Sequence, residues 1–410
     1  MTASSRSEHD LLGDRDVPAD AYWGVHTLRA TENFPITGTP ISAYPHLIDA
    51  LAAVKEAAAL ANGELGLLEP SKAAVIVAAC QESTNDVYPT AVRIATVFAV
   101  RGLLDAMAVL QNAFADKAAE FHDVLKMGRT QLQDAVSMTL GQEFSAFAGM
   151  LDEDRSRLAE ALGLIHEINL GATAIGTGLN APAGYAEAAR RHLADITGLP
   201  LVTAPDLVEA AQDCGAFVQM SGVLKRIAVK LSKTCNDLRL LSSGPRAGLG
   251  EINLPPVQAG SSIMPGKVNP VIPEVVNQVA FEVIGNDITI TMAAEAGQLQ
   301  LNAFEPVILH SLSKSVTHVR AACLTLAERC VSGITANTDM LRATVEYSIG
   351  LVTALNPYIG YTAATDIAKE ALATGRGVAE LVLERGLLPA GQLSALLRPE
   401  VIAGTGPVRT

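Results

Sequence analysis

Three features of the sequence predict a mainly α-helical protein with a central bundle of long helices and smaller N-terminal and C-terminal domains. Hydrophobic residues make up 49% of the 410 residues and aromatic residues only 4%, a balance that suits packed helices better than sheets. Long stretches repeat apolar residues at helical spacing. The chain also exceeds the usual size of one compact core, so two or three domains are expected.

The first part of the chain is predicted to be less regular than the rest. Residues 1–45 are rich in Asp, Pro and Gly, and the segment DRDVPADAYWGVHT indicates extended or irregular structure. A helix is expected from about His46 to Leu67, and a further apolar segment, Ser71–Cys80, runs abruptly into QESTNDVYPT. Pro89 suits the first turn of a helix that continues through Leu110.

The middle of the chain is predicted to form the bundle. Apolar residues recur at helical spacing over Leu140–Ile168, Asp206–Leu241, Pro270–Gly297 and Phe304–Val331. Three polar, turn-forming stretches interrupt this pattern: MGRTQLQDAV, GATAIGTGLNAPAGY and AGSSIMPGKVNPVIPE. The tail from Tyr347 shows shorter helices separated by Gly and Pro. The expected domains are therefore 1–82, a central helical bundle over 83–345, and a small helical domain over 346–410.

Charge and cysteine content exclude several classes of protein. The net charge of −13 and the absence of a basic run argue against a general binder of nucleic acid or membrane surfaces. The cysteines are dispersed without CxxC spacing, so reduced, mostly buried thiols are expected. They are Cys80, Cys214, Cys235, Cys323 and Cys330. The polar, acidic N-terminus has no signal-peptide pattern, so a cytoplasmic location is expected.

The stretch AGSSIMPGKVNPVIPE suits either a solvated connector or an anion-binding loop. Asn269 and Pro270 form a good helix start, which would bring the end of the loop close to the positive end of a helix dipole. Ser261 and Ser262 offer hydroxyls, and Lys267 offers a positive charge. Spacing alone favours the connector.

Two further polar stretches have the same ambiguity. STNDVYPT at 83–90 and GRTQLQD at 128–134 carry hydroxyl and amide side chains that suit either helix caps and turns or a binding site. GTGLNAP at 176–182 fits a phosphate-loop spacing, but no strand-rich βαβ unit surrounds it, so dinucleotide binding is not expected. The sequence contains no HExxH, P-loop or GxSxG motif.

In combination, these stretches resemble the aspartase/fumarase superfamily, whose signature GSSxMPxKxN stands here at Gly260–Asn269. The resemblance extends from Leu11 to about Pro399. Within the superfamily the chain is most similar to the aspartases, in LLGDRDVPADAYWGVHTLRATENFPI, in the Gln131 of GRTQLQD, and in VIPEVVNQVAFEVIGND after the signature. Fumarases usually have His at the Gln131 position and a Thr-Gln-Cys-Glu run in place of VIPE.

The resemblance implies a reversible elimination of ammonia from L-aspartate that gives fumarate through an aci-carboxylate. Ser261 matches the general base. The matching substrate ligands are Ser83, Thr84 and Asn85, then Thr130 and Gln131, then Lys267 and Asn269. Residues that match the support of the loop are Gly260, Ser262, Met264, Gly266 and Glu274. In the family these segments meet from different subunits of a homotetramer, and the loop closes over the substrate without a cofactor.

One departure from the family pattern affects the expected site. Family members usually carry several dozen residues between the helix that ends near Cys80 and the STNDVYPT motif, and here Gln81 and Glu82 join the two directly. The missing block normally includes Gly-Thr-Ser and Asn-Met-Asn segments that bind substrate. Two alternatives to an aspartase therefore stay open: a fumarate hydratase-like lyase, and a non-catalytic paralogue that keeps the oligomeric bundle.

Overall fold

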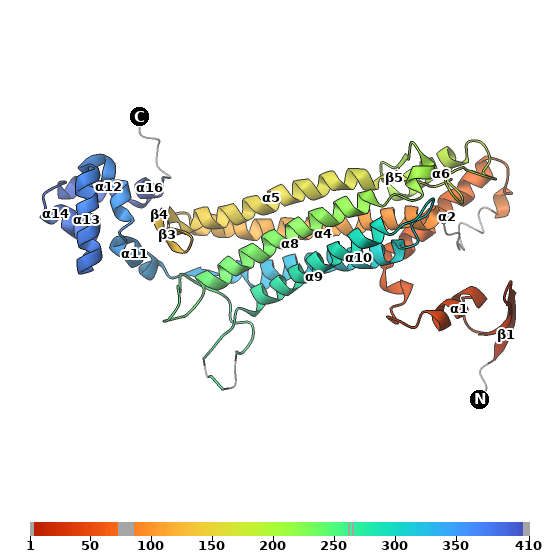
Figure 1. Ribbon diagram of the computed structural model, residues 1–410, viewed down its shortest axis with the longest axis horizontal. Helices are drawn as coiled ribbons and strands as arrows, with labels where there is room; N and C mark the ends of the chain where they lie inside the picture. Colours follow the sequence, from red (N-terminus) through yellow and green to blue (C-terminus); the bar gives the residue numbers. More distant parts are fainter. Residues whose placement is uncertain (1–3, 73–85, 261–262, 265, 405–410) are drawn as a thin grey trace.

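The structure is a computed structural model that describes residues 4–72, 86–260, 263–264 and 266–404. Its centre is an elongated bundle of long antiparallel helices (Figure 1). The bundle helices are α4 (Val87–Glu120), α5 (Leu140–Ile165), α8 (Gly215–Leu241), α9 (Val271–Glu295) and α10 (Glu305–Arg329). Helix α4 packs against α5 and α10, and α8 packs against α5 and α9. The predicted mainly α fold with a long-helix bundle is confirmed.

The bundle holds together through one continuous apolar core. The early turns of α4 contribute an almost unbroken buried run that includes Val92, Ile94 and Val97. Nearer its other end, Phe114 lies with its ring centroid 6.0 Å from that of Phe144, within a cluster of tilted and edge-on aromatic rings. Burial on several faces explains why α4 is apolar all round rather than amphipathic.

Helix α4 is also, among the described residues, long and apolar enough to cross a membrane by length and composition. Its neighbours in the bundle are α2 (Pro45–Glu64), α5 and α10. Contact with these helices accounts for the apolar composition of α4, because the core helix of a bundle needs the same residues as a membrane span.

The predicted long helices are confirmed, with one break. The stretch predicted as Asp206–Leu241 contains the short α7 (Leu207–Ala210), followed by α8 from Gly215. Asp206 accepts hydrogen bonds from the backbone N–H groups of Val208 and Glu209, which caps α7. Asp213 accepts from the N–H of Gly215. Two side chains that compete for backbone donors therefore interrupt a continuous helical period.

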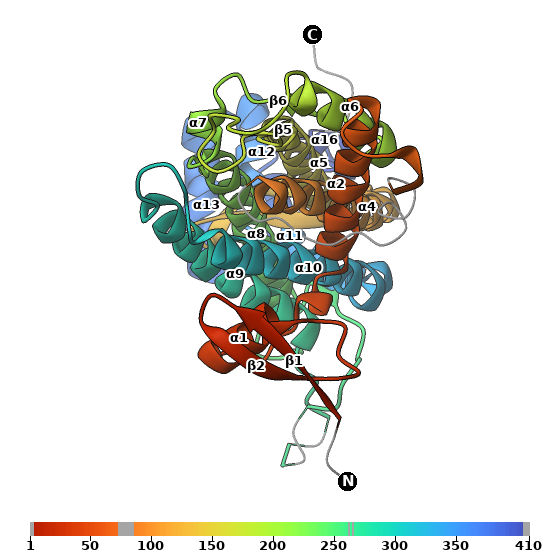
Figure 2. The ribbon, with the colours of Figure 1, turned by 90° about the vertical axis from the view of Figure 1, so that its right-hand side faces the viewer.

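The N-terminal region is more regular than expected. Residues before α2 form a β-hairpin and two short helical segments: β1 (Ser5–Asp10), β2 (Gly13–Pro18), α1 (Val25–Asn33) and the 3-10 segment η1 (Ile41–Ala43). The Glu8 carboxylate accepts a hydrogen bond of 2.8 Å from the N–H of Val25, a backbone donor in the first turn of α1. The predicted extended structure is confirmed in β2, and the prediction was wrong for α1, which is held by this contact between residues distant in sequence. The hairpin projects below the bundle (Figure 2).

Three further pairs of short strands lie in the loops between the helices of the described part of the chain. They are β3 (Leu125–Thr130) with β4 (Gln133–Thr139), β5 (Glu167–Ile168) with β6 (Val202–Thr203), and β7 (Ile252–Asn253) with β8 (Thr335–Ala336). The MGRTQLQDAV stretch is therefore the tip of an antiparallel hairpin, not a simple turn and cap. The helix α6 (Tyr185–Thr197) and the 3-10 segment η2 (Val331–Gly333) complete this part of the chain.

The C-terminal helices gather around a hydrophobic cluster that is separate from the bundle core. Val345, Leu355 and Ile367 are among its buried members. The helices are α11 (Thr338–Tyr347), α12 (Leu351–Ile359), α13 (Tyr361–Thr374), α14 (Val378–Glu384), α15 (Ala390–Leu396) and α16 (Pro399–Ile402). They lie at one end of the bundle, beyond the β3–β4 hairpin (Figure 1).

Candidate active site

The signature loop leaves the bundle between α8 and α9 and extends away from it (Figure 1). A Cβ atom at Gly260 would lie 2.0 Å from the backbone oxygen of Lys267, so the two arms of the loop approach too closely for any other residue. Lys267 donates its backbone N–H to the oxygen of Met264 over 3.2 Å, and Gly266 adopts a φ of +82° within this turn. The glycines therefore determine the path of the loop, and the Lys267 side chain is exposed.

The candidate base Ser261 and its neighbour Ser262 lie outside the described residues, and their roles stay predictions. The residues on both sides of them, Gly260 and Met264, are exposed. These two flanking residues are therefore open to solvent in the single chain.

The loop ends at the start of α9, as predicted. The helix begins at Val271 after an N-cap at Pro270, which supplies no side-chain capping bond. Glu274 in the first turn lies 3.8 Å from the Arg239 guanidinium of α8. The loop thus ends beside the free N–H groups and the positive dipole end of a 25-residue helix, where an anion is favoured.

The tip of the β3–β4 hairpin carries the second described segment of candidate ligands. Thr130 and Gln133 pair across the tip, and the residues between them have left-handed backbones, with φ of 52° at Gln131 and 63° at Leu132. Such turns normally contain Asn or Gly, because other side chains are strained there. Thr130 and Gln131 are exposed. This strained turn presents the polar side chains to solvent at the end of the bundle.

Buried ion pairs anchor the base of this hairpin. The Lys126 ammonium is 2% exposed and lies 2.5 Å from Glu143 of α5 and 2.8 Å from Glu251. The second carboxylate oxygen of Glu251 pairs with Arg129, the residue before Thr130. Glu251 therefore contacts two cations of one strand, at the point where the chain leaves α8 for the signature loop.

The remaining candidate segment, Ser83–Asn85, lies outside the described residues. Asp86, which follows it directly, is buried at the start of α4 and accepts a hydrogen bond of 3.0 Å from the N–H of Gly171. The GATAIGTGLN stretch around Gly171 contains several left-handed residues, including Thr173 and Asn180. This stretch, which was not assigned a binding role, lies with Asp86 at the other end of the bundle (Figure 1).

The hairpin tip and the signature loop therefore lie far from Asp86, the residue that follows the undescribed segment Ser83–Asn85 (Figure 1). The hairpin tip and the signature loop lie at the end where α4 finishes, and Asp86 lies where α4 starts (Figure 1). Helix α4 has 34 residues, which corresponds to roughly 50 Å. A single chain cannot bring both groups to one small substrate.

Buried acidic residues were not predicted from the sequence, and Glu251 and Glu305 are two examples. Glu251 follows a Gly-rich turn, and Glu305 precedes a proline at a helix start, a position where acidic residues are ordinarily solvated. Glu305 is 9% exposed, and burial raises its pKa to about 7 although the nearby Arg93 guanidinium opposes the shift. Neither position has a local pattern that signals burial.

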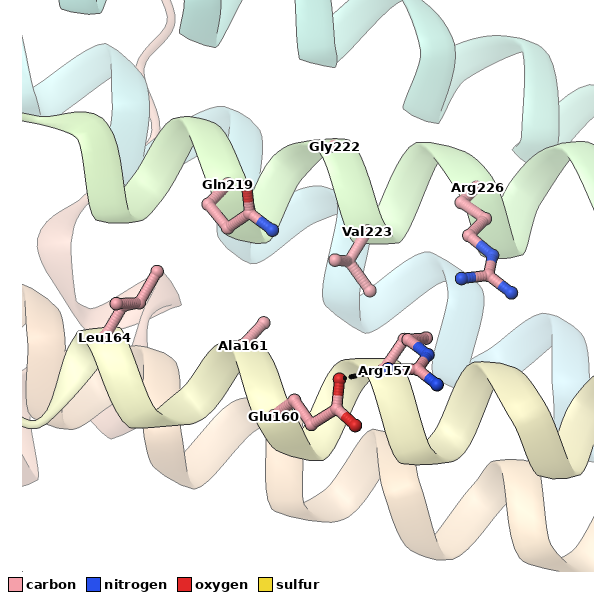
Figure 3. Close-up of a pocket in the computed structure, with 8 residues that line it drawn as sticks. All are labelled: Arg157, Glu160, Ala161, Leu164, Gln219, Gly222, Val223 and Arg226. Carbon is pink, nitrogen blue, oxygen red and sulfur yellow. Dashed lines mark hydrogen bonds and ion pairs between the residues drawn. The ribbon is translucent and has the colours of Figure 1, made fainter.

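A surface groove between α5 and α8 has a volume of about 370 Å³. Figure 3 shows Ala161 and Leu164 of α5 facing Val223 of α8 across it, with an ion pair between Arg157 and Glu160 at one side. None of the candidate site residues in the described part of the chain lines the groove. It lies along the middle of the bundle, between α5 and α8.

Comparisons with known proteins assign this helical bundle to the lyases. Residues 82–285 match the family model described as "Lyase", and residues 351–404 match "Fumarase C C-terminus". An aspartate ammonia-lyase of Pseudomonas aeruginosa is 53% identical over 97% of this chain and 97% of its own length. The Escherichia coli K12 aspartate ammonia-lyase is 50% identical over 96% of this chain and 95% of its own length.

Solved structures show the same relationship. A fumarate lyase:delta crystallin from Brucella melitensis, bound to cobalt, has a TM-score of 0.94 at 49% identity and covers 98% of this chain and 100% of its own. A class II fumarase from Schistosoma mansoni has a TM-score of 0.91 at 29% identity with the same coverages, 98% and 100%. The chain belongs to the aspartase/fumarase superfamily of lyases, and within it is most similar to the aspartate ammonia-lyases.

The comparisons also bear on the missing block. The alignment with the Pseudomonas aeruginosa protein spans 458 positions, 48 more than the 410 residues of this chain, so at least that many alignment positions have no residue here. This number agrees with the several dozen residues expected to be missing before Ser83.

Proposed function

We propose that this protein is an aspartate ammonia-lyase that eliminates ammonia from L-aspartate to give fumarate. The observation that carries the proposal is the 53% identity to an aspartate ammonia-lyase over 97% of the chain, with the signature intact at Gly260–Asn269. Gln131 also supports this reaction over fumarate hydration, because fumarases usually carry His at that position.

The chemistry requires strong stabilisation of negative charge. Removal of a proton next to a carboxylate creates a dianionic aci-carboxylate, so hydrogen-bond donors and cations must be aimed at the developing charge. In our proposal Ser261 removes the proton as an oxyanion, and Lys267 and Asn269 bind a substrate carboxylate. The start of α9, which follows shortly after Asn269 in the chain, favours a bound carboxylate, because its first N–H groups and its dipole end are positive.

The proposed active enzyme is a homotetramer in which candidate segments from different subunits meet. The separation of roughly 50 Å along α4 supports this, because Asp86 and the hairpin tip of one chain cannot share a substrate. An exposed apolar stripe on α9 supports association as well. Phe281, Ile288 and Met292 are 63%, 62% and 61% exposed there, and a monomer gains nothing from such a stripe.

The compartment and the domain division are also part of the proposal. The cysteines in the described part of the chain, Cys214, Cys235, Cys323 and Cys330, are free and buried, which suits a reducing compartment such as the cytoplasm. The separate hydrophobic cluster around Leu355 supports a small C-terminal domain over 346–410 beside a bundle over 83–345 and an N-terminal domain over 1–82.

A non-catalytic role is the second candidate, and a specific observation favours it. At least 48 alignment positions of a catalytic relative have no counterpart here. The family resemblance places substrate ligands in the missing block, and a base acts poorly on a substrate that is not fully held.

The decisive experiment measures fumarate formation from L-aspartate by ultraviolet absorbance, with the purified protein and with its Ser261→Ala variant. We expect turnover by the wild type, and loss of turnover without loss of assembly in the variant. A folded tetramer that gives no fumarate would establish the non-catalytic candidate. Hydration of fumarate to malate without deamination would instead identify a fumarase.

A further inference from the structure

Glu251 occupies the junction between two segments of the candidate site. It is 1% exposed, at the end of the turn that leads from α8 toward the signature loop. Its backbone N–H donates to Leu241 over 2.8 Å, and its backbone oxygen accepts from the N–H of Asn337 over 3.0 Å. The adjacent residues form β7 and pair with β8. The position of Glu251 is therefore fixed by backbone bonds on both sides.

The side chain of Glu251 reaches from this junction to the hairpin. One carboxylate oxygen lies 2.8 Å from the Lys126 ammonium, and the other pairs with the Arg129 guanidinium. Both cations belong to β3, which ends at Thr130. Lys126 has a second anionic partner in Glu143. For Arg129, by contrast, Glu251 is the only anion within ion-pair distance among the described residues.

The hairpin tip needs such an anchor because it is strained. Consecutive left-handed residues at Gln131 and Leu132 cost free energy, and strained backbone persists only where surrounding contacts hold it. Leu132 is 69% exposed, so its own side chain supplies little packing. The ion pair between Arg129 and the buried Glu251 holds the residue directly before the tip on the β3 side.

We propose that Glu251 is a positioning residue for the lyase reaction: it holds the Thr130–Gln131 turn and the root of the signature loop in fixed relative positions. This inference rests on the proposed function, which assigns substrate binding to both segments. Glu251 itself does not touch the substrate. Its charge acts through Arg129 on the turn and through its backbone on the loop, including where the two segments serve different active sites of a tetramer.

The variant Glu251→Gln tests the role of the charge. Glutamine keeps the size of the side chain but offers one acceptor oxygen and an NH2 group, so it cannot face both cations. We expect kcat/KM for L-aspartate to fall about 10-fold to 100-fold, as expected when reacting groups are displaced by about 1 Å. We also expect backbone hydrogen exchange to quicken in residues 129–134 and 252–260.

Asp154→Asn is the matched control. Asp154 is 1% exposed and its carboxylate also contacts two cations, Arg226 at 3.0 Å and Lys230 at 2.9 Å, but these lie along the bundle between α5 and α8. We expect this variant to lower thermal stability while kcat/KM and exchange in the two segments stay within 2-fold of wild type. A loss in Glu251→Gln that Asp154→Asn reproduces would overturn the positioning role, because it would reflect stability alone.

Arg129→Gln covers the case in which Glu251→Gln does not fold. Arg129 is 18% exposed, and its loss leaves Lys126 between two carboxylates. We expect a lowered kcat/KM and faster exchange in residues 129–134 alone, with substantial recovery in Arg129→Lys. Unchanged exchange at the turn would overturn the inference. Hydrogen exchange also distinguishes the failure of one proposal from the failure of the other. If the wild type has no turnover, the proposed function is wrong, and the exchange rates of the variants still test the positioning role of Glu251.

Discussion

The buried carboxyl group of Glu305 makes stability depend on pH in a predictable direction. Its pKa is raised from the ordinary 4.5 to about 7, with burial as the main cause and the Arg93 charge in opposition. The native protein therefore binds this proton more tightly than the unfolded chain does. The stabilising contribution is fully present below pH 4.5, and it is lost as the pH rises through about 7.

The magnitude follows from the two pKa values. One pH unit corresponds to about 1.4 kcal/mol, so ionising Glu305 in the folded protein costs about 3 kcal/mol relative to the unfolded chain. Glu305→Gln removes the ionisable group and keeps its shape. We expect the variant to exceed the wild type in unfolding free energy by about 3 kcal/mol at pH 8 and to differ little from it at pH 4.5.

The assay is urea unfolding at both pH values, at one fixed protein concentration because assembly contributes to stability. Glu328→Gln on the same helix is the control, since the same change is made there at an exposed position. An equal difference between Glu305→Gln and wild type at pH 4.5 and pH 8 would refute the reasoning, because the effect would then come from packing rather than from ionisation.

Three further changes test the loop, the hairpin tip and the α9 stripe. Gly260→Ala places a Cβ atom 2.0 Å from the backbone oxygen of Lys267. We therefore expect kcat/KM for L-aspartate to fall at least 10-fold while the circular dichroism spectrum stays unchanged. Full activity would show that the two arms of the loop separate freely. Leu132→Gly removes the side chain from a residue with a φ of 63°. We expect the free energy of unfolding, measured by urea titration, to rise by about 1 kcal/mol. A decrease would mean that the Leu132 side chain packs against another subunit in the assembly. Phe281→Asp puts a charge on the exposed apolar stripe of α9, so we expect a smaller particle in analytical ultracentrifugation. Thr289→Asp, at an exposed residue of the same helix, is the control. An unchanged mass in Phe281→Asp would show that the stripe is not part of the subunit interface.

The long helices were predictable because their pattern is local. Apolar residues at helical spacing indicated α5, α9 and α10 to within a few residues of their observed ends. The hairpin at Thr130 was not predicted, since its strands are short and its tip lacks the Asn-Gly pair typical of such turns. The break before Gly215 was missed because Asp206 and Asp213 compete with the helix through side-chain bonds.

For the candidate site, the residue types came from sequence, and their arrangement came from the structure. The signature at Gly260–Asn269 identified the family without coordinates, and Gly260 and Gly266 prove to be required by the path of the loop. The link from Glu251 to Arg129 joins residues far apart in the chain, and no periodicity could reveal it.

The sequence alone determined that this protein is a helical member of the aspartase/fumarase superfamily, because motifs and helical periods are properties of neighbouring residues. Only the tertiary structure decided that the hairpin tip and the start of α4 lie at opposite ends of the bundle (Figure 1). It also decided which acidic side chains are buried, Glu251 and Glu305 among them. The physical reason is that burial and separation depend on how distant helices pack, and local sequence does not encode that packing directly.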